Sequence, residues 1–193
     1  MIINKFNDQS VNYAQMNLIF NARNLWRNLA TWMRAYLVAR FTGIDISDDI
    51  FMRLYEIPVE FGHIFRLIFG DQITDKYVQQ LSSAIVLFKD FIEAEIAGDT
   101  DHASEIAKQL YQSADNRAAF LASINPYWSE TEWKNLIYTF YKYTYDEITS
   151  FLSGNPRSIP IFDQILKQAD KMGDYLAQGL FYYILDSTCN LLI

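Results

Sequence analysis

Several residue types are scarce in this 193-residue chain, and each scarcity excludes a class of structure or partner. The single cysteine excludes an intramolecular disulfide framework and indicates a reducing compartment, so we expect a cytoplasmic protein. Seven glycines and four prolines are too few for the many turns of a β-sandwich or barrel, which favours long helices. Only 16 Lys and Arg stand against 23 Asp and Glu, and the net charge of −7 argues against a nucleic-acid partner.

Long apolar runs are also missing. Residues 1–15 lack the apolar core of a signal peptide, and no stretch reaches the roughly 18 apolar residues of a membrane-spanning helix. The most apolar stretch, residues 180–193, is interrupted by polar side chains. We interpret it as a last helix docked on the core, with a dimer contact and a membrane anchor as the alternatives. We therefore expect no membrane partner.

What the chain has in abundance is apolar and aromatic surface. Hydrophobic residues make up 51% of the sequence and aromatic residues 16%. A chain of this length should bury roughly 70% of its unfolded surface, which suits one domain over residues 1–193 and excludes intrinsic disorder.

Apolar residues recur at steps of three and four, the period of amphipathic helices. The pattern predicts a helix ending near Gly43. A second helix, capped by Ser47 or Asp45, is expected to run to about Phe69, where Gly70 stops it, and to be kinked or divided at Pro58. Further helices are expected to end at Gly98, near Ile124, at Gly154 and near Leu185. Asp99 is the expected cap of the helix after Gly98. Ser129 and Glu132 fit a capping box, in which each side chain accepts the other residue's amide.

Three glycines give the chain its organisation, because Gly43, Gly98 and Gly154 lie at nearly equal spacing and each follows a long helix. An apolar anchor follows each of them by eleven or twelve residues, at Leu54, Leu110 or Ile165. We infer an internal repeat of three αα-hairpins of about 55 residues, at approximately 15–70, 74–124 and 129–185. The prediction is an all-α bundle of six helices, favoured over a short solenoid by the aromatics on several faces.

Some segments, including Trp26 to Arg34 and the run Asn125-Pro126-Tyr127-Trp128-Ser129, resemble a family of small bacterial all-helical proteins of uncharacterised function. The resemblance covers about residues 15–180. Members of that family tend to carry a histidine fourteen residues before each repeat glycine, and those positions here hold Leu29, Ala84 and Phe140. The resemblance therefore implies a polar centre that this chain has lost. By helical spacing we expect the three residues to meet in a dry core centre, with no cofactor.

One helical face has the spacing of metal ligands. Glu56, Glu60 and His63 lie at i, i+4 and i+7, and Glu-x-x-His is the ligand pair of ferritin-like bundles. Such a site needs the motif twice, but the only other histidine, His102, has no Glu three residues before it. Pro58 also interrupts the face. An ordinary polar surface is the competing interpretation.

Two aspartates, Asp115 and Asp170, occupy matching repeat positions. They would act as an acid–base pair or bind a cation if both pointed inward. Each could equally be a solvated helix residue, with Arg117 or Lys171 close enough in sequence for a local ion pair.

Aromatic residues crowd the segment from 127 to 145. We expect them to line a ligand pocket or to form core on one side and a partner interface on the other. The candidates are Tyr127, Trp128, Tyr138, Tyr141 and Tyr145.

No phosphate loop, nucleophile elbow or Cys-x-x-Cys motif occurs in the chain. The function predicted is therefore a non-enzymatic bundle that binds a partner or a small ligand, and that forms a homodimer through an aromatic or C-terminal face. The alternative is a metal-binding bundle, an oxidoreductase or metal carrier, that uses Glu56, Glu60 and His63.

Overall fold

The computed structural model describes residues 13–154 and 158–189, and five α-helices account for nearly all of that part. They are α1 (Tyr13–Thr42), α2 (Ser47–Ala97), α3 (Thr100–Ile124), α4 (Glu130–Leu152) and α5 (Ser158–Cys189). No β-strand occurs in the described ranges, so the all-α prediction is confirmed there.

The count of five helices, against six expected, is explained by α2. Its residue Gly70 has φ 76° and ψ −179°, outside the helical region, and the chain reverses direction there. The rings of Phe65 and Tyr77 stack with centroids 4.4 Å apart, whereas a straight helix would separate residues twelve apart by about 18 Å. Two antiparallel arms, residues 47–69 and 71–97, thus replace the two helices expected there.

Glycine is required at this reversal because its positive φ strains any residue with a side chain. Arg66 spans the turn, with its Nε 2.7 Å from Asp71 and its Nη2 2.7 Å from Asp75. The helix end expected at Gly70 is therefore confirmed, whereas Pro58 lies within the helical first arm and does not divide it.

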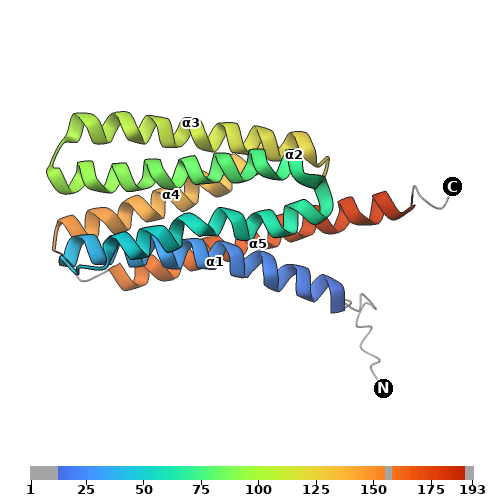
Figure 1. Ribbon diagram of the computed structural model, residues 1–193, viewed down its shortest axis with the longest axis horizontal. Coiled ribbons are helices and arrows are strands. Elements are labelled where there is room, and N and C mark those ends of the chain that lie inside the picture. The colour runs from blue at the N-terminus through green and yellow to red at the C-terminus, as the bar shows by residue number, and fades with distance from the viewer. Residues whose placement is uncertain (1–12, 155–157, 190–193) are drawn as a thin grey trace, which may run out of the picture.

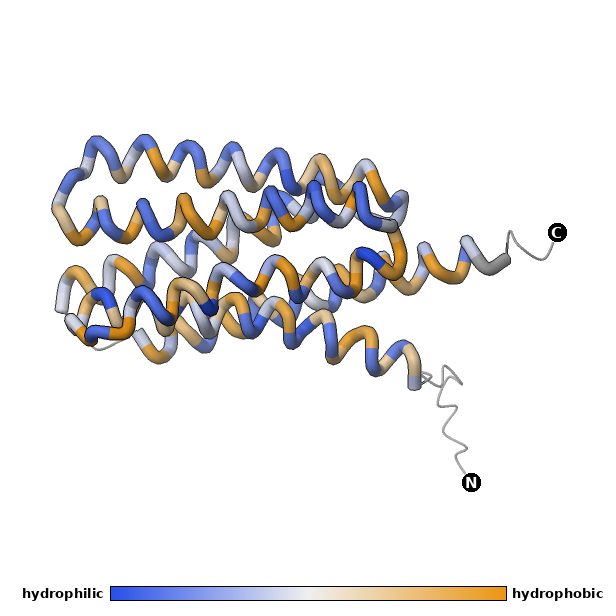
Figure 2. Tube along the Cα trace, viewed as in Figure 1, coloured by the Kyte–Doolittle hydropathy of each residue, from blue (hydrophilic) through white to orange (hydrophobic). Residues whose placement is uncertain are grey.

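The helices lie side by side as an elongated bundle (Figure 1). The second arm of α2 and α3 form one side, α1 and α5 the other, and α4 lies between them. At one end, the start of α1 and the end of α5 diverge from each other (Figure 1). Hydrophilic and hydrophobic residues alternate along every helix, as amphipathic packing requires (Figure 2).

The helix ends follow the glycines. Gly43, Gly98 and Gly154 have φ of 69°, 71° and 64°, the left-handed conformation of a helix C-terminus. Asp99 caps α3 by accepting the amide of His102 at 3.0 Å. The expected cap of α2 is wrong: Ile46 is the N-cap residue, and no side chain bonds there.

The capping box at Ser129 forms only in half. The Ser129 hydroxyl accepts a hydrogen bond from the Glu132 amide at 3.4 Å. The Ser129 amide donates to the Tyr175 hydroxyl at 2.7 Å instead of to the Glu132 side chain. The acceptor for the Ser129 amide thus comes from the distant helix α5, whereas the sequence predicted an acceptor three residues away.

The repeat anchors Leu54, Leu110 and Ile165 are all buried in the core. Small residues let the elements approach closely: a Cβ at Gly179 would lie 1.9 Å from the Trp128 indole nitrogen.

Within the described ranges, no helix combines the length and apolar character that crossing a membrane requires. Residues 190–193, the end of the apolar C-terminal stretch, lie outside the described residues.

Candidate functional site

Two adjoining cavities lie inside the bundle and share Phe88 and Tyr141 as wall residues. The outer cavity, of about 60 Å³, lies between the second arm of α2, α3 and α4. Tyr111 and Tyr145 stand on its wall and are 40% and 51% exposed, which places them at its mouth. The inner cavity, of about 30 Å³, extends toward α1 and α5.

The structure brings the three predicted centre residues together. Leu29, Ala84 and Phe140 are at most 5% exposed, and all three line the inner cavity. They come from α1, α2 and α4, one from each of the three predicted hairpins.

One charged side chain interrupts this apolar wall. Arg117 of α3 is 5% exposed and lines the inner cavity. Its Nη2 donates to the Tyr141 hydroxyl at 2.6 Å, while its Nη1 is buried without a hydrogen-bond partner. Among the described residues no carboxylate forms an ion pair with it. An uncompensated buried charge is costly, so this guanidinium needs an explanation.

A second donor without an acceptor stands on the same wall. The indole nitrogen of Trp26 is buried and has no hydrogen-bond partner in the described part of the chain. Tyr77 lies nearby: burial raises the pKa of its phenol, and the positive charge of Arg117 opposes that rise. The inner cavity is therefore apolar apart from a small set of groups that are mostly donors.

The five predicted aromatic residues do not form one pocket. Tyr141 and Tyr145 line the outer cavity, whereas Tyr138 donates its hydroxyl to Asp115 at 2.7 Å. Trp128 is core: it is 3% exposed and donates its indole N–H to the backbone oxygen of Tyr175. Tyr127 is a surface residue whose hydroxyl donates to Asp186 of α5.

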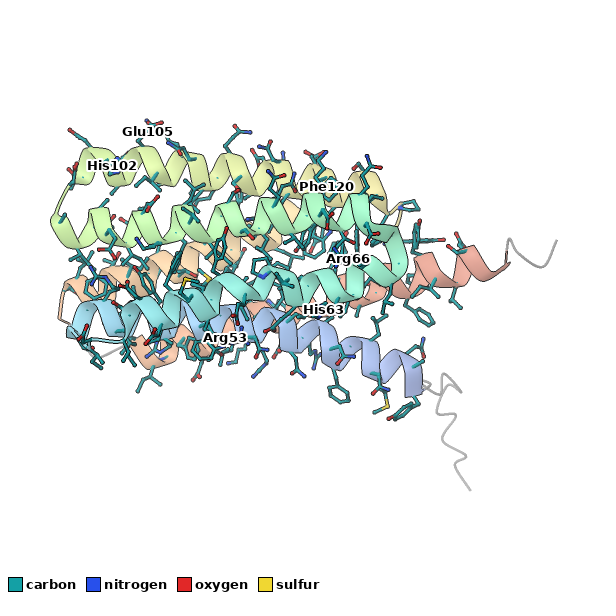
Figure 3. The ribbon with its side chains drawn as sticks, in the orientation of Figure 1. Arg53, His63, Arg66, His102, Glu105 and Phe120 are labelled. Atoms are coloured by element: carbon teal, nitrogen blue, oxygen red, sulfur yellow. The ribbon has the colours of Figure 1, made fainter. Side chains whose placement is uncertain are left out.

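The predicted metal ligands are not brought together. Glu60 pairs with Arg53 at 2.6 Å, and Glu56 and His63 are exposed. Across residues 13–154 and 158–189 no three His, Cys, Asp or Glu side chains form a group that would hold a metal. The two histidines lie on different elements, His63 on α2 and His102 on α3, well apart in Figure 3. The helical spacing of the three ligands is present, but their face points to solvent.

The matching aspartates also stay apart, and their predicted partners are wrong. Asp170 accepts hydrogen bonds from both Nε and Nη2 of Arg27 across the α1–α5 contact. These hydrogen bonds lower the pKa of the Asp170 carboxyl. Asp115 lies 3.6 Å from Lys134 Nζ and accepts the Tyr138 hydroxyl. Both are half-buried ion pairs between helices, with no shared site.

Sequence reasoning missed Arg117 as a cavity residue, although a signal was present. It lies seven residues after the anchor Leu110, and the equivalent residues in the other two hairpins are Phe61 and Met172. Both of those are buried core residues, and Met172 lines the inner cavity as well. A cation at an otherwise apolar position of the predicted repeat marks a departure from simple core packing.

No protein-family model, curated protein or solved structure matches this chain.

Proposed function

We propose that this protein binds a small apolar ligand in the two adjoining cavities of its bundle. The observation that carries the proposal is the pair of cavities itself, which share Phe88 and Tyr141 and are walled by apolar and aromatic side chains from all five helices. Ligand sites typically combine such walls with a few polar groups that fix orientation, and Arg117 and Tyr141 supply these here.

The cavity dimensions favour a slim ligand. Volumes of about 60 and about 30 Å³ are below the roughly 150 Å³ engineered cavity that holds benzene. A linear aliphatic chain threads such a space better than a ring does. Entry is between Tyr111 and Tyr145, whose exposed side chains can change rotamer without disturbing the core.

The test is isothermal titration calorimetry with 1-hexanol, an uncharged linear probe. We expect one saturable site in the wild-type chain. Ala107 of α3 is half-buried on the wall of the outer cavity, so Ala107→Phe should fill the cavity and abolish binding. Ala119→Phe, an exposed position on the same helix, is the matched control and should leave binding unchanged.

Absence of a saturable heat in the wild-type chain would contradict the proposal. So would equal binding by Ala107→Phe and the wild type, since the probe would then lie elsewhere on the molecule.

A second candidate, homodimer formation, rests on the diverging end of the bundle. A groove of about 660 Å³ lies there between α1, α2 and α5, and none of its wall residues is charged. Leu67 on that wall is 88% exposed, and an exposed apolar side chain in an uncharged groove is typical of the centre of a protein interface. We propose that a second copy of the chain covers this groove.

Sedimentation velocity tests the dimer. Leu67→Glu should convert the dimer to a monomer. Val59 is 51% exposed on the same arm of α2, and Val59→Glu should leave the dimer intact. A wild-type chain that sediments as a monomer throughout a concentration series would refute the dimer without affecting the ligand proposal.

The resemblance to small bacterial all-helical proteins is a further proposal, and it is supported by the three positions that line the inner cavity. If that family places histidines there, its polar centre would occupy the space that Leu29, Ala84 and Phe140 close here.

A further inference from the structure

We infer that the ligand of the inner cavity is a short-chain monocarboxylate, bound through Arg117 by its carboxylate and through the outer cavity by its apolar tail. This rests on the proposed function, because it specifies the chemical class of the ligand in the same cavities. It is carried by a different observation, the unpaired donors of the inner wall.

The charge of Arg117 is the first step. The burial cost of a guanidinium is relieved only by a counter-charge and by hydrogen-bond acceptors. The two oxygens near it that the structure identifies belong to the phenols of Tyr141 and Tyr77, which are uncharged. Water in the cavity would accept a hydrogen bond from Nη1 but would bring no negative charge, whereas a bound anion supplies both.

The donor pattern is the second step. Arg117 Nη1 and Trp26 Nε1 are both buried, both lack an acceptor, and both belong to wall residues of the inner cavity. Tyr141 uses its oxygen to accept from Arg117, which leaves its own proton free to donate. A carboxylate has two oxygens and accepts up to four hydrogen bonds, so it matches three donors from α1, α3 and α4.

The apolar walls exclude more polar anions. Phosphate and sulfate carry further oxygens that would have to be buried against Leu29, Ala84 and Phe140 without partners. A monocarboxylate leaves only a hydrocarbon tail to accommodate, and the outer cavity leads from Tyr141 toward the mouth between Tyr111 and Tyr145.

The experiment compares hexanoate, 1-hexanol and acetate by isothermal titration calorimetry at one ionic strength. Hexanoate should bind the wild-type chain at least about tenfold more tightly than 1-hexanol, the ratio expected for a charge-assisted hydrogen bond. Acetate, which has the charge without the tail, should bind more weakly than hexanoate. Arg117→Met should abolish the preference for hexanoate over 1-hexanol while retaining 1-hexanol binding.

Two variants complete the design. Arg66→Met removes the same charge from an exposed site at the α2 turn, and it should keep the preference. Tyr141→Phe removes a single hydroxyl from the cavity wall and should reduce the preference several-fold, so it decides the matter if Arg117→Met does not fold.

The outcomes separate the two proposals. Equal affinities for hexanoate and 1-hexanol, a preference that survives in Arg117→Met, or a preference that Tyr141→Phe leaves at its wild-type size would overturn the carboxylate and leave the apolar site standing. Acetate binding as tightly as hexanoate would overturn the role of the tail. Binding of none of the three probes would refute the proposed function and this inference together.

Discussion

Replacing Ala84 with histidine tests whether the three hairpins meet where the structure places them. Ala84 is 5% exposed, and the adjoining cavity of about 30 Å³ is too small for an imidazole ring. The imidazole N–H would find no acceptor beside Leu29 and Phe140, because the polar groups of the inner cavity are mostly donors, and this burial costs about 1–3 kcal/mol. Overpacking adds about 1–3 kcal/mol. We expect Ala84→His to lower the free energy of unfolding by about 2–6 kcal/mol.

The measurement is urea unfolding at pH 8, followed by circular dichroism. The matched control is Ala119→His, because it has the same loss of helix propensity at an exposed position on α3. A difference of less than about 0.5 kcal/mol between the two variants would refute the burial of position 84 and the alignment of the repeats.

The same variant has a pH signature with a definite sign. Burial lowers the pKa of an imidazole below its unfolded value of about 6.5, so the unfolded state takes up more protons as the pH falls. The stability of Ala84→His should therefore decrease below about pH 6.5, by about a further 1.4 kcal/mol at pH 5.5 relative to pH 8. Ala119→His should show no such loss.

Three further predictions follow from the packing. Histidine placed at all three cavity positions at once should make a zinc site, with a melting temperature about 5–10 °C higher at a zinc concentration one hundred times Kd, and no zinc effect in the wild type. Glu147 is 1% exposed and pairs with Arg34, so Glu147→Ala should cost about 3–5 kcal/mol in urea unfolding, more than replacing both partners with Met. Hydrogen bonds from Arg40 lower the pKa of the Glu93 carboxyl. The stability contributed by this lowered pKa is present above the unfolded pKa of Glu93 and is lost as the pH falls through the folded pKa. The Arg40→Met variant should therefore lose less stability on acidification than the wild type does. ¹³C NMR of the variant should show the pKa of Glu93 raised toward its ordinary value.

Local features of the fold were predictable from sequence because they have local causes. Gly43, Gly98 and Gly154 mark helix ends since a positive φ there suits glycine. Asp99 caps α3 because its carboxylate reaches an amide three residues away. Helical periodicity placed Leu29, Ala84 and Phe140 on apolar stripes, and all three are buried and line the inner cavity.

Features that depend on partners far along the chain were not predictable. Asp170 was expected to pair with its neighbour Lys171, but α5 packs on α1 and brings Arg27 to it. Likewise, α5 packs on α4 and brings the Tyr175 hydroxyl to the Ser129 amide, which donates to it instead of to Glu132. The break at Gly70, by contrast, was predictable, because the helical pattern ends at Phe69 and glycine adopts the positive φ found there.

The central claim, that a ligand enters the interior of this bundle, is tested most directly by NMR of ¹³C-labelled methionine methyl groups. Met33 and Met172 line the inner cavity, whereas Met16 and Met52 are 44% and 62% exposed elsewhere on the surface. On titration with hexanoate, the signals of Met33 and Met172 should shift together and saturate, while those of Met16 and Met52 stay in place. Shifts confined to Met16 and Met52, or unchanged signals from Met33 and Met172 at saturating hexanoate, would contradict the account.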